Sequence, residues 1–123
     1  MVKLVESTHA SAALVGEAEN FYCRESIKIA PNTTIEACTV LGQVTVGGAY
    51  TGLAPGAADG SQTASAVAIY GISTGANGGE IAAWVRGPVS LRRSDIVWSQ
   101  PGITEPQKTT ALTALEALGF VFR

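Results

Sequence analysis

Alternation of apolar and polar residues is the clearest pattern in the chain, and it predicts a domain dominated by short strands. In "FYCRESIKIA", Cys23, Ile27 and Ile29 share one parity, while most of the polar residues occupy the other. A period of two is typical of a strand with one solvated face. After the turn-like "PNTT", the stretch "EACTVLGQVTV" is rich in β-branched residues and predicts a second strand, interrupted by Gly42.

Two nearly continuous apolar runs, "ASAVAIYGI" and "GEIAAWVRG", predict buried strands. The intervening "STGANGG" contains Asn77-Gly78, a favoured hairpin dipeptide, so we expect the two strands to pair antiparallel. "PVSLRRSDIVW" follows Gly87-Pro88, and its opening alternation of Val89 and Leu91 with polar residues predicts another strand. The Gly-Pro break indicates a kinked edge or a change of sheet.

The stretch "GGAYTGLAPGAADGSQ" is rich in turn-forming residues and predicts a long loop. A phosphate-binding loop would lead its glycines into a helix, in the Walker case with a Lys and a Ser/Thr, and neither arrangement occurs here. These glycines are therefore interpreted as turn residues.

One helix is predicted, in "TEPQKTTALTALEALG". Thr104 and Gln107 have the spacing of a capping box, and Pro106 is tolerated in the first turn. The apolar stripe consists of Ala111, Leu112, Leu115 and Leu118, and it ends at Gly119. "FVFR" then predicts a short terminal strand or tail. The expected fold class is a small, β-dominated α+β domain of short strands and long turns with one C-terminal helix, preceded by an extended N-terminal arm.

The arm is predicted for residues 1 to about 20, which mix small, polar and scattered apolar residues without a core-facing pattern. The alternative is a short amphipathic helix around "SAALVGEAE". Gly16 interrupts that segment, and a helix so short is marginal without packing.

Composition excludes several classes of function. The 123 residues, 46% of them hydrophobic, suffice for the core of one ordinary domain. With 15% charged residues and a net charge of −2, the chain lacks the basic excess needed to bind free nucleic acid. Its longest apolar runs fall far short of the roughly 20 residues that cross a bilayer, and the N-terminus lacks the pattern of a signal peptide. We therefore expect a soluble protein made in the cytoplasm.

The inventory of reactive side chains argues against an enzyme. Cys23 and Cys38 are the only cysteines, and we expect two reduced, buried thiols. His9 is the only histidine, which leaves no base for a nucleophile and no metal-ligand set. Asp59 and Asp95 form a conceivable carboxylate pair, but scattered acidic residues are more often a solvated surface. No catalytic residue, cofactor or metal is predicted.

Four segments in this order resemble a known family: "IAPNTTIEACTVLGQVT", "DGSQTASAVAIY", "AAWVRGPVSLRRSDIVW" and "EPQKTTALTALEALGFVFR". Together they resemble the head decoration proteins of tailed double-stranded DNA phages, the phage lambda type. The resemblance covers about residues 20–123. It implies a non-enzymatic capsid cement protein, made in the host cytoplasm, that binds the outside of the expanded head as a homotrimer at local three-fold positions. There it would brace the head against internal DNA pressure.

The resemblance also implies a division of the chain and two partners, a second copy of itself and the major capsid protein. Residues 1–30 would form the capsid-binding arm and residues 31–123 the β-rich decoration domain. The candidate arm contacts are Phe21, Tyr22, Arg24, Ile27 and Ile29. No role in the family follows for the two cysteines.

The segment with both tryptophans supplies a second set of candidates, because Trp and Arg are enriched at interfaces. Candidate trimer or capsid contacts are Arg86, Arg92, Arg93 and Trp98. The alternative is that both tryptophans are core or half-buried residues, with a core position favoured for Trp84, and that Arg92, Arg93 and Asp95 form a local solvated ion cluster. A different function, a β-rich module that binds a ligand such as a carbohydrate, would require exposed rings among Tyr50, Tyr70 and the tryptophans.

Overall fold

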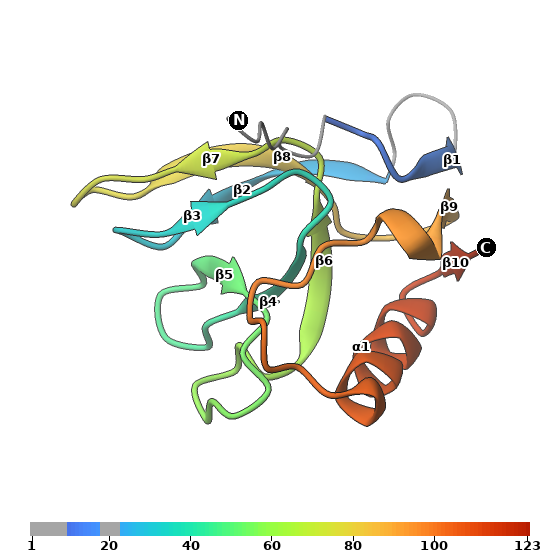
Figure 1. Ribbon diagram of the computed structural model, residues 1–123. Coiled ribbons are helices and arrows are strands. Elements are labelled where there is room, and N and C mark those ends of the chain that lie inside the picture. The colour runs from blue at the N-terminus through green and yellow to red at the C-terminus, as the bar shows by residue number, and fades with distance from the viewer. Residues whose placement is uncertain (1–9, 18–22) are drawn as a thin grey trace, which may run out of the picture.

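The computed structural model describes residues 10–17 and 23–123, and these residues form ten strands and one α-helix (Figure 1). In chain order the elements are β1 (Leu14–Glu17), β2 (Arg24–Ile29), β3 (Thr34–Ile35), β4 (Val40–Gln43), β5 (Tyr50–Gly52), β6 (Ala64–Ala68), β7 (Ile72–Ser73), β8 (Gly79–Trp84), β9 (Val89–Leu91), a 3-10 helix (Arg93–Asp95), α1 (Glu105–Glu116) and β10 (Phe120–Phe122). The prediction of a β-dominated α+β domain with one C-terminal helix is confirmed.

A closed barrel of five strands, in the order β2-β5-β4-β6-β8, forms the centre of the fold. β2 and β8 pair antiparallel along their whole length, from Arg24 opposite Trp84 to Ile29 opposite Gly79. β6 and β8 are also antiparallel neighbours, which confirms the predicted pairing. The chain between them does not turn directly, because β7 first pairs with β3 in a separate two-stranded ribbon. This ribbon and the ends of β2 and β8 project from the left of Figure 1.

Strand alternation divides the apolar side chains between two clusters. One joins the barrel interior to Ile35 on β3, and it contains Ile27, Ile29, Ile35, Leu41, Ala66, Ala68, Ile81 and Ala83. The other lies between the barrel and the elements that cover it, and Trp84 is its largest member. Ala83 therefore belongs to one cluster and Trp84, the next residue, to the other. Burial on both faces explains why β6 and β8 are almost continuously apolar.

A second sheet of three strands, in the order β1-β9-β10, lies beside the barrel. β1 is antiparallel to β9, and β10 is parallel to it. β8 belongs to the barrel and β9 to this sheet, so the Gly87-Pro88 break marks the predicted change of sheet. Gly87 lies against the turn after α1, where an added Cβ would lie 2.0 Å from the carbonyl oxygen of Gly119. Only glycine fits at this crossing.

The C-terminal helix begins as the sequence predicts. The Thr104 hydroxyl accepts from the Gln107 backbone N–H, and the Gln107 side chain accepts from the Thr104 backbone N–H, which completes the capping box. Ala111, Leu112 and Leu115 are buried. Leu118, which was also assigned to the apolar stripe, lies beyond the last helical residue and is 42% exposed. That assignment was wrong because the helix ends before Leu118 reaches the buried face.

The N-terminal segment differs from its prediction wherever the structure describes it. Ala13 is fully buried, and residues 14–17 form β1 rather than a short helix or an arm without core contacts. The remaining residues of the predicted arm, 1–9 and 18–20, lie outside the described residues. The predicted long loop also contains a strand, β5, which pairs with both β4 and β2.

Candidate functional site

Both cysteines are free, buried thiols, as predicted. The Cys23 Sγ–H donates to the carbonyl oxygen of Pro88 at 3.1 Å, and Cys38 Sγ accepts from the Ala13 backbone N–H at 3.4 Å. Burial raises the pKa of the Cys38 thiol above its ordinary value, while the Ala13 N–H opposes this shift. Cys38 is therefore protonated at neutral pH, unlike a nucleophilic cysteine.

The two aspartates considered as a catalytic pair are each bound to local partners. Asp59 Oδ1 accepts hydrogen bonds from the hydroxyl and the backbone N–H of Ser61, and these bonds lower the pKa of the Asp59 carboxyl. Asp95 forms an exposed ion pair with Arg92 at 3.0 Å. Within residues 10–17 and 23–123, no group of three His, Cys, Asp or Glu residues could hold a metal ion. His9 lies outside the described residues.

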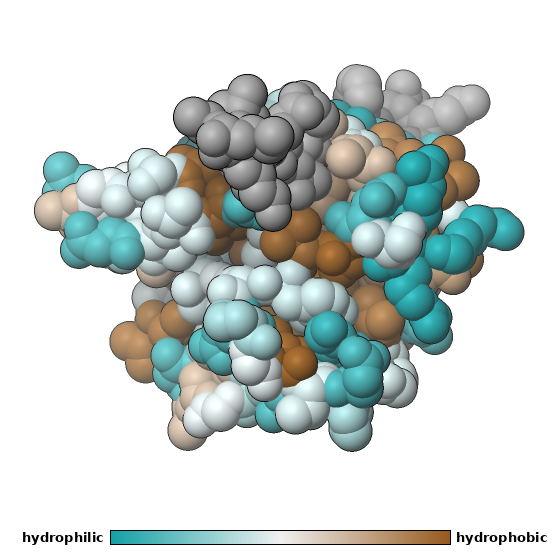
Figure 2. Space-filling view, in the orientation of Figure 1, coloured by the Kyte–Doolittle hydropathy of each residue, from teal (hydrophilic) through white to brown (hydrophobic). Residues whose placement is uncertain are grey.

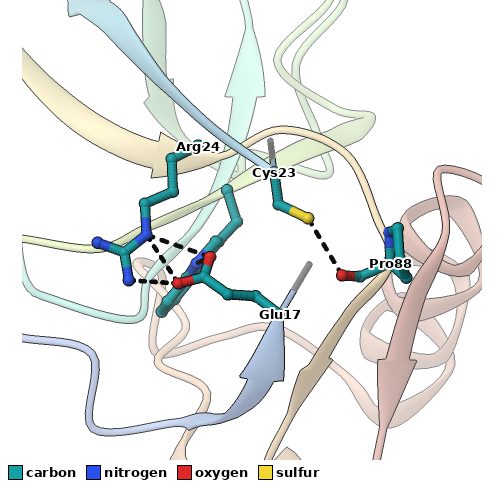
Figure 3. Close-up of polar contacts among 5 residues, drawn as sticks. Glu17, Cys23, Arg24 and Pro88 are labelled. Atoms are coloured by element: carbon teal, nitrogen blue, oxygen red, sulfur yellow. Dashed lines mark hydrogen bonds and ion pairs between the residues drawn. The ribbon is translucent and has the colours of Figure 1, made fainter. Parts of the chain in front are cut away.

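A polar cluster of Glu17, Arg24 and Trp84 joins the N-terminal strand to the barrel (Figure 3). The Arg24 Nε–H donates to both carboxylate oxygens of Glu17, at 2.9 and 3.1 Å, and the guanidinium makes a further bond to Oε1. The Trp84 Nε1–H donates to Glu17 Oε2 at 3.1 Å. The bond to Glu17 raises the pKa of the Arg24 guanidinium, which is positively charged at any ordinary pH. One carboxylate thus links β1 with two strands of the barrel.

The predicted arm residues fall into three environments. Phe21 and Tyr22 lie outside the described residues. Arg24 is bound to Glu17, as above. Ile27 and Ile29 point into the barrel, where they are 6% and 2% exposed, in agreement with the buried parity of the strand predicted for this segment. Of this set, Arg24 is the described side chain that lies at the junction with the N-terminal segment.

The second set of predicted contacts is distributed over the surface rather than gathered in one site. Arg86, two residues beyond the end of β8, is paired with Glu25 on β2 at 2.6 Å. Arg92 is paired with Asp95, and Arg93 is exposed at the start of the 3-10 helix. The Arg92–Asp95 pair is part of the local ion cluster of the alternative interpretation. Their role at an interface stays a prediction.

The aromatic residues do not form an exposed platform. Trp84 is fully buried, as favoured from the sequence. Trp98 is half-buried against the outer cluster, with Lys108 Nζ 5.9 Å from its ring centroid. Tyr50 is also half-buried, and of the aromatic side chains in residues 10–17 and 23–123 Tyr70 alone is exposed, at 49%. The ring stacking typical of carbohydrate recognition is therefore not favoured.

The outer face of the three-stranded sheet is the surface that sequence reasoning missed. Gly16, Ser90 and Val121 lie in one row across its strands. A shallow groove on this face is lined by Gly16, Glu17, Pro88, Val89, Ser90, Val121 and Arg123. Val15 and Val121 are 50% and 46% exposed. Elsewhere, Figure 2 shows apolar residues in separate patches among polar ones.

The described helix is too short to cross a membrane. A protein-family model described as "Bacteriophage lambda head decoration protein D" matches residues 3–120. The match includes every strand from β1 to β9 and the helix α1, and at its N-terminal end it extends beyond the segments that carried the resemblance. A comparison with curated proteins found no match.

Proposed function

The chain belongs to the bacteriophage lambda head decoration protein D family, and from this membership we propose that it cements the phage head. The family has a structural role in the capsid of the virion. The proposed action is finer: the protein binds the outer surface of the expanded head, as a homotrimer at local three-fold positions, and stabilises the head against the pressure of packaged DNA. The family match over residues 3–120 is the observation that carries the proposal.

The architecture is consistent with a mechanical role. A closed barrel leaves each of its strands hydrogen-bonded to two neighbours, so the body of the protein is held by many backbone bonds. The outer cluster adds side-chain packing between the barrel, the second sheet and α1. A body of this kind transmits load between neighbouring capsid subunits without changing its own fold.

Attachment is proposed to depend on the N-terminal arm, with residues 1–30 as the capsid-binding region. An extended arm that adds a strand to a capsid sheet binds mainly through main-chain hydrogen bonds. Phe21 and Tyr22 remain the proposed apolar anchors. Ile27 and Ile29 contribute differently, because their buried side chains fix β2 in the barrel and so hold the end of the arm in place.

Self-association is proposed to involve the exposed apolar residues near the second sheet, together with the arginines predicted as contacts. Val15, Leu118 and Val121 are each more than 40% exposed, and burying them between copies would remove apolar surface from water. Arg86, Arg92, Arg93 and Trp98 stay candidate contacts around this core.

The test is to mix the purified protein with expanded, undecorated capsids of its own phage. We expect co-sedimentation that saturates, and added density over the local three-fold positions in images of the decorated particles. Unexpanded capsids are the matched control and should bind far less. Absence of binding to expanded capsids would refute the proposal, whereas a monomer by light scattering in solution would refute only a preformed trimer.

A further inference from the structure

Glu17, the last residue of β1, is held against the barrel by two chemically different donors, the Arg24 guanidinium and the Trp84 indole N–H. Arg24 lies on β2 and Trp84 on β8, so the carboxylate bridges two neighbouring strands of the barrel. The Glu17 and Arg24 side chains are only 12% and 24% exposed. A charge-assisted, two-point contact with so little water is stronger than an exposed surface ion pair.

Trp84 favours one position of the Glu17 carboxylate over others. Its ring is fully buried, and its indole N–H can only donate a hydrogen bond. If β1 moved away, this N–H would lose Glu17, and an unsatisfied buried donor is costly. The structure therefore favours the arrangement in which Glu17 lies beside Trp84.

The other end of the same segment is also fastened. The Ser11 N–H donates to Ile69 O at 3.1 Å, the Ala13 N–H donates to Cys38 Sγ, and the Arg92 N–H donates to Ala13 O at 2.6 Å. The buried Ala13 side chain lies in the outer cluster. Residues 11–17 thus form a strap, closed over Cys38 near its start and bound to Trp84 at its end.

We propose that Glu17 is a positioning residue for capsid binding, which fixes the strap to the barrel in one defined place. This inference rests on the proposed cement function, in which the strap is part of the capsid-binding region of residues 1–30. A strap that is already fixed loses less conformational entropy when this region binds the capsid.

The first experiment is Glu17→Gln in the full-length chain. An amide is uncharged and has one acceptor oxygen where the carboxylate has two, so Gln loses the ion pair with Arg24 and one of the two oxygens that Arg24 and Trp84 bind. We expect binding to expanded capsids about tenfold weaker than that of the wild type. Thr104→Ala is the matched control, because it destabilises α1 at its capping box, away from the strap. It should lower the melting temperature yet change capsid binding less than about twofold.

The second experiment follows the strap directly, by labelling Cys38 with a thiol reagent in a Cys23→Ser background. The strap covers the Cys38 thiol, so labelling requires the strap to open. At temperatures below the melting transition, Glu17→Gln should make labelling about tenfold faster, because the strap has lost a buried contact. Thr104→Ala should speed it only as far as it promotes global unfolding.

The outcomes separate the inference from the proposed function. If wild-type protein binds capsids and Glu17→Gln binds equally well, the positioning role is refuted while the cement function stands. If Thr104→Ala weakens binding as much as Glu17→Gln at equal loss of melting temperature, the effect is one of stability and the positioning role is again refuted. If the wild type does not bind, the proposed function fails, and the labelling result alone then reports whether Glu17 holds the strap.

Discussion

The barrel and the three-stranded sheet differ in how their edges are completed. In the barrel every strand has two neighbours, so no edge is left open. In the sheet, β1 and β10 pair with β9 alone among the described strands. The open sheet also contains β1, the first described strand, and its strand β10 lies next to the C-terminus (Figure 1). The fold thus separates a closed barrel from a sheet with two outer strands.

The barrel and the three-stranded sheet also differ in the interactions that stabilise them. The cluster inside the barrel is purely apolar, so its stability comes from packing and from the strand ladders. The sheet is joined to the barrel partly by individual polar bonds, from Glu17 to Trp84 and from Ala13 to Cys38. Substitutions in the barrel should therefore lower the stability of the whole domain, whereas substitutions at the polar junction should loosen the sheet first.

The largest expected effect comes from adding a methyl group to a strand of the barrel, by Gly42→Ala on β4. The new Cβ would lie 2.3 Å from the carbonyl oxygen of Ser61, so backbone would have to move. We expect a loss of about 3 kcal/mol in the free energy of unfolding, measured by denaturant titration.

The matched control for Gly42→Ala is Gly16→Ala on β1, where an added Cβ meets no heavy atom within 4 Å. The free energy of unfolding should change by less than about 0.5 kcal/mol. Equal losses in the two variants would show that the closed barrel and the open sheet do not differ in tolerance.

A smaller effect is expected at the helix that packs against both regions. Removing the capping hydroxyl by Thr104→Ala leaves the Gln107 N–H without its side-chain acceptor, and should cost about 1 kcal/mol in the free energy of unfolding. Thr113→Ala, on the exposed face of the same helix, should be neutral or slightly stabilising, since Ala is the better helix former. A comparable loss in both variants would argue against the cap as the cause.

Elements whose signals are local could be predicted from the sequence. For α1, the cap at Thr104, the buried stripe and the terminal Gly119 lie close together in the chain, so each supports the others. For β6 and β8, two apolar runs flank Asn77-Gly78, and burial on both faces makes each run continuous. These elements were found because their residues need no distant partner to be recognised.

The N-terminal strand could not be predicted because its partners are distant. The Ala13 N–H donates to Cys38 Sγ, and Leu14 lies opposite Leu91, 77 positions later in the chain. The candidate site shows the same limit. Arg24 was proposed as an arm contact, but its partner Glu17 was not singled out, since its link to Trp84 spans 67 positions. β5 was missed because Tyr50–Gly52 lies within a glycine-rich stretch that resembles a loop.

Alkaline pH should weaken the junction beneath the strap through Cys38. Its folded pKa is raised above the ordinary value of 9.0, so above that pH the unfolded chain loses the proton before the folded one does. Stability is therefore fully present below about pH 9 and falls as the pH rises further. Cys38→Ser should flatten the fall in melting temperature that begins near pH 9.

Tyr50 provides a comparison from the barrel, because burial raises its pKa above the ordinary value of 10.0. Tyr50→Phe should change the pH dependence only from about pH 10 upward. A fall that begins near pH 9 and is the same in wild type and Cys38→Ser would contradict the assignment to Cys38.

The smallest effect is expected at Asp59, whose polar contacts are local rather than long-range. Its carboxylate binds the hydroxyl and N–H of Ser61, two residues away, and these bonds lower its folded pKa below the ordinary value of 3.8. A depressed folded pKa means that the stabilisation is present above the unfolded pKa and is lost as the pH falls through the folded one. Because Asp59 is exposed, solvent screens the contact and the effect should be slight. Asp59→Asn should melt slightly below the wild type near pH 7, and the two curves should converge below about pH 3. A gap that persists unchanged in acid would mean that the charge of Asp59 is not what stabilises the loop, and that local and long-range polar contacts in this fold differ less than the structure indicates.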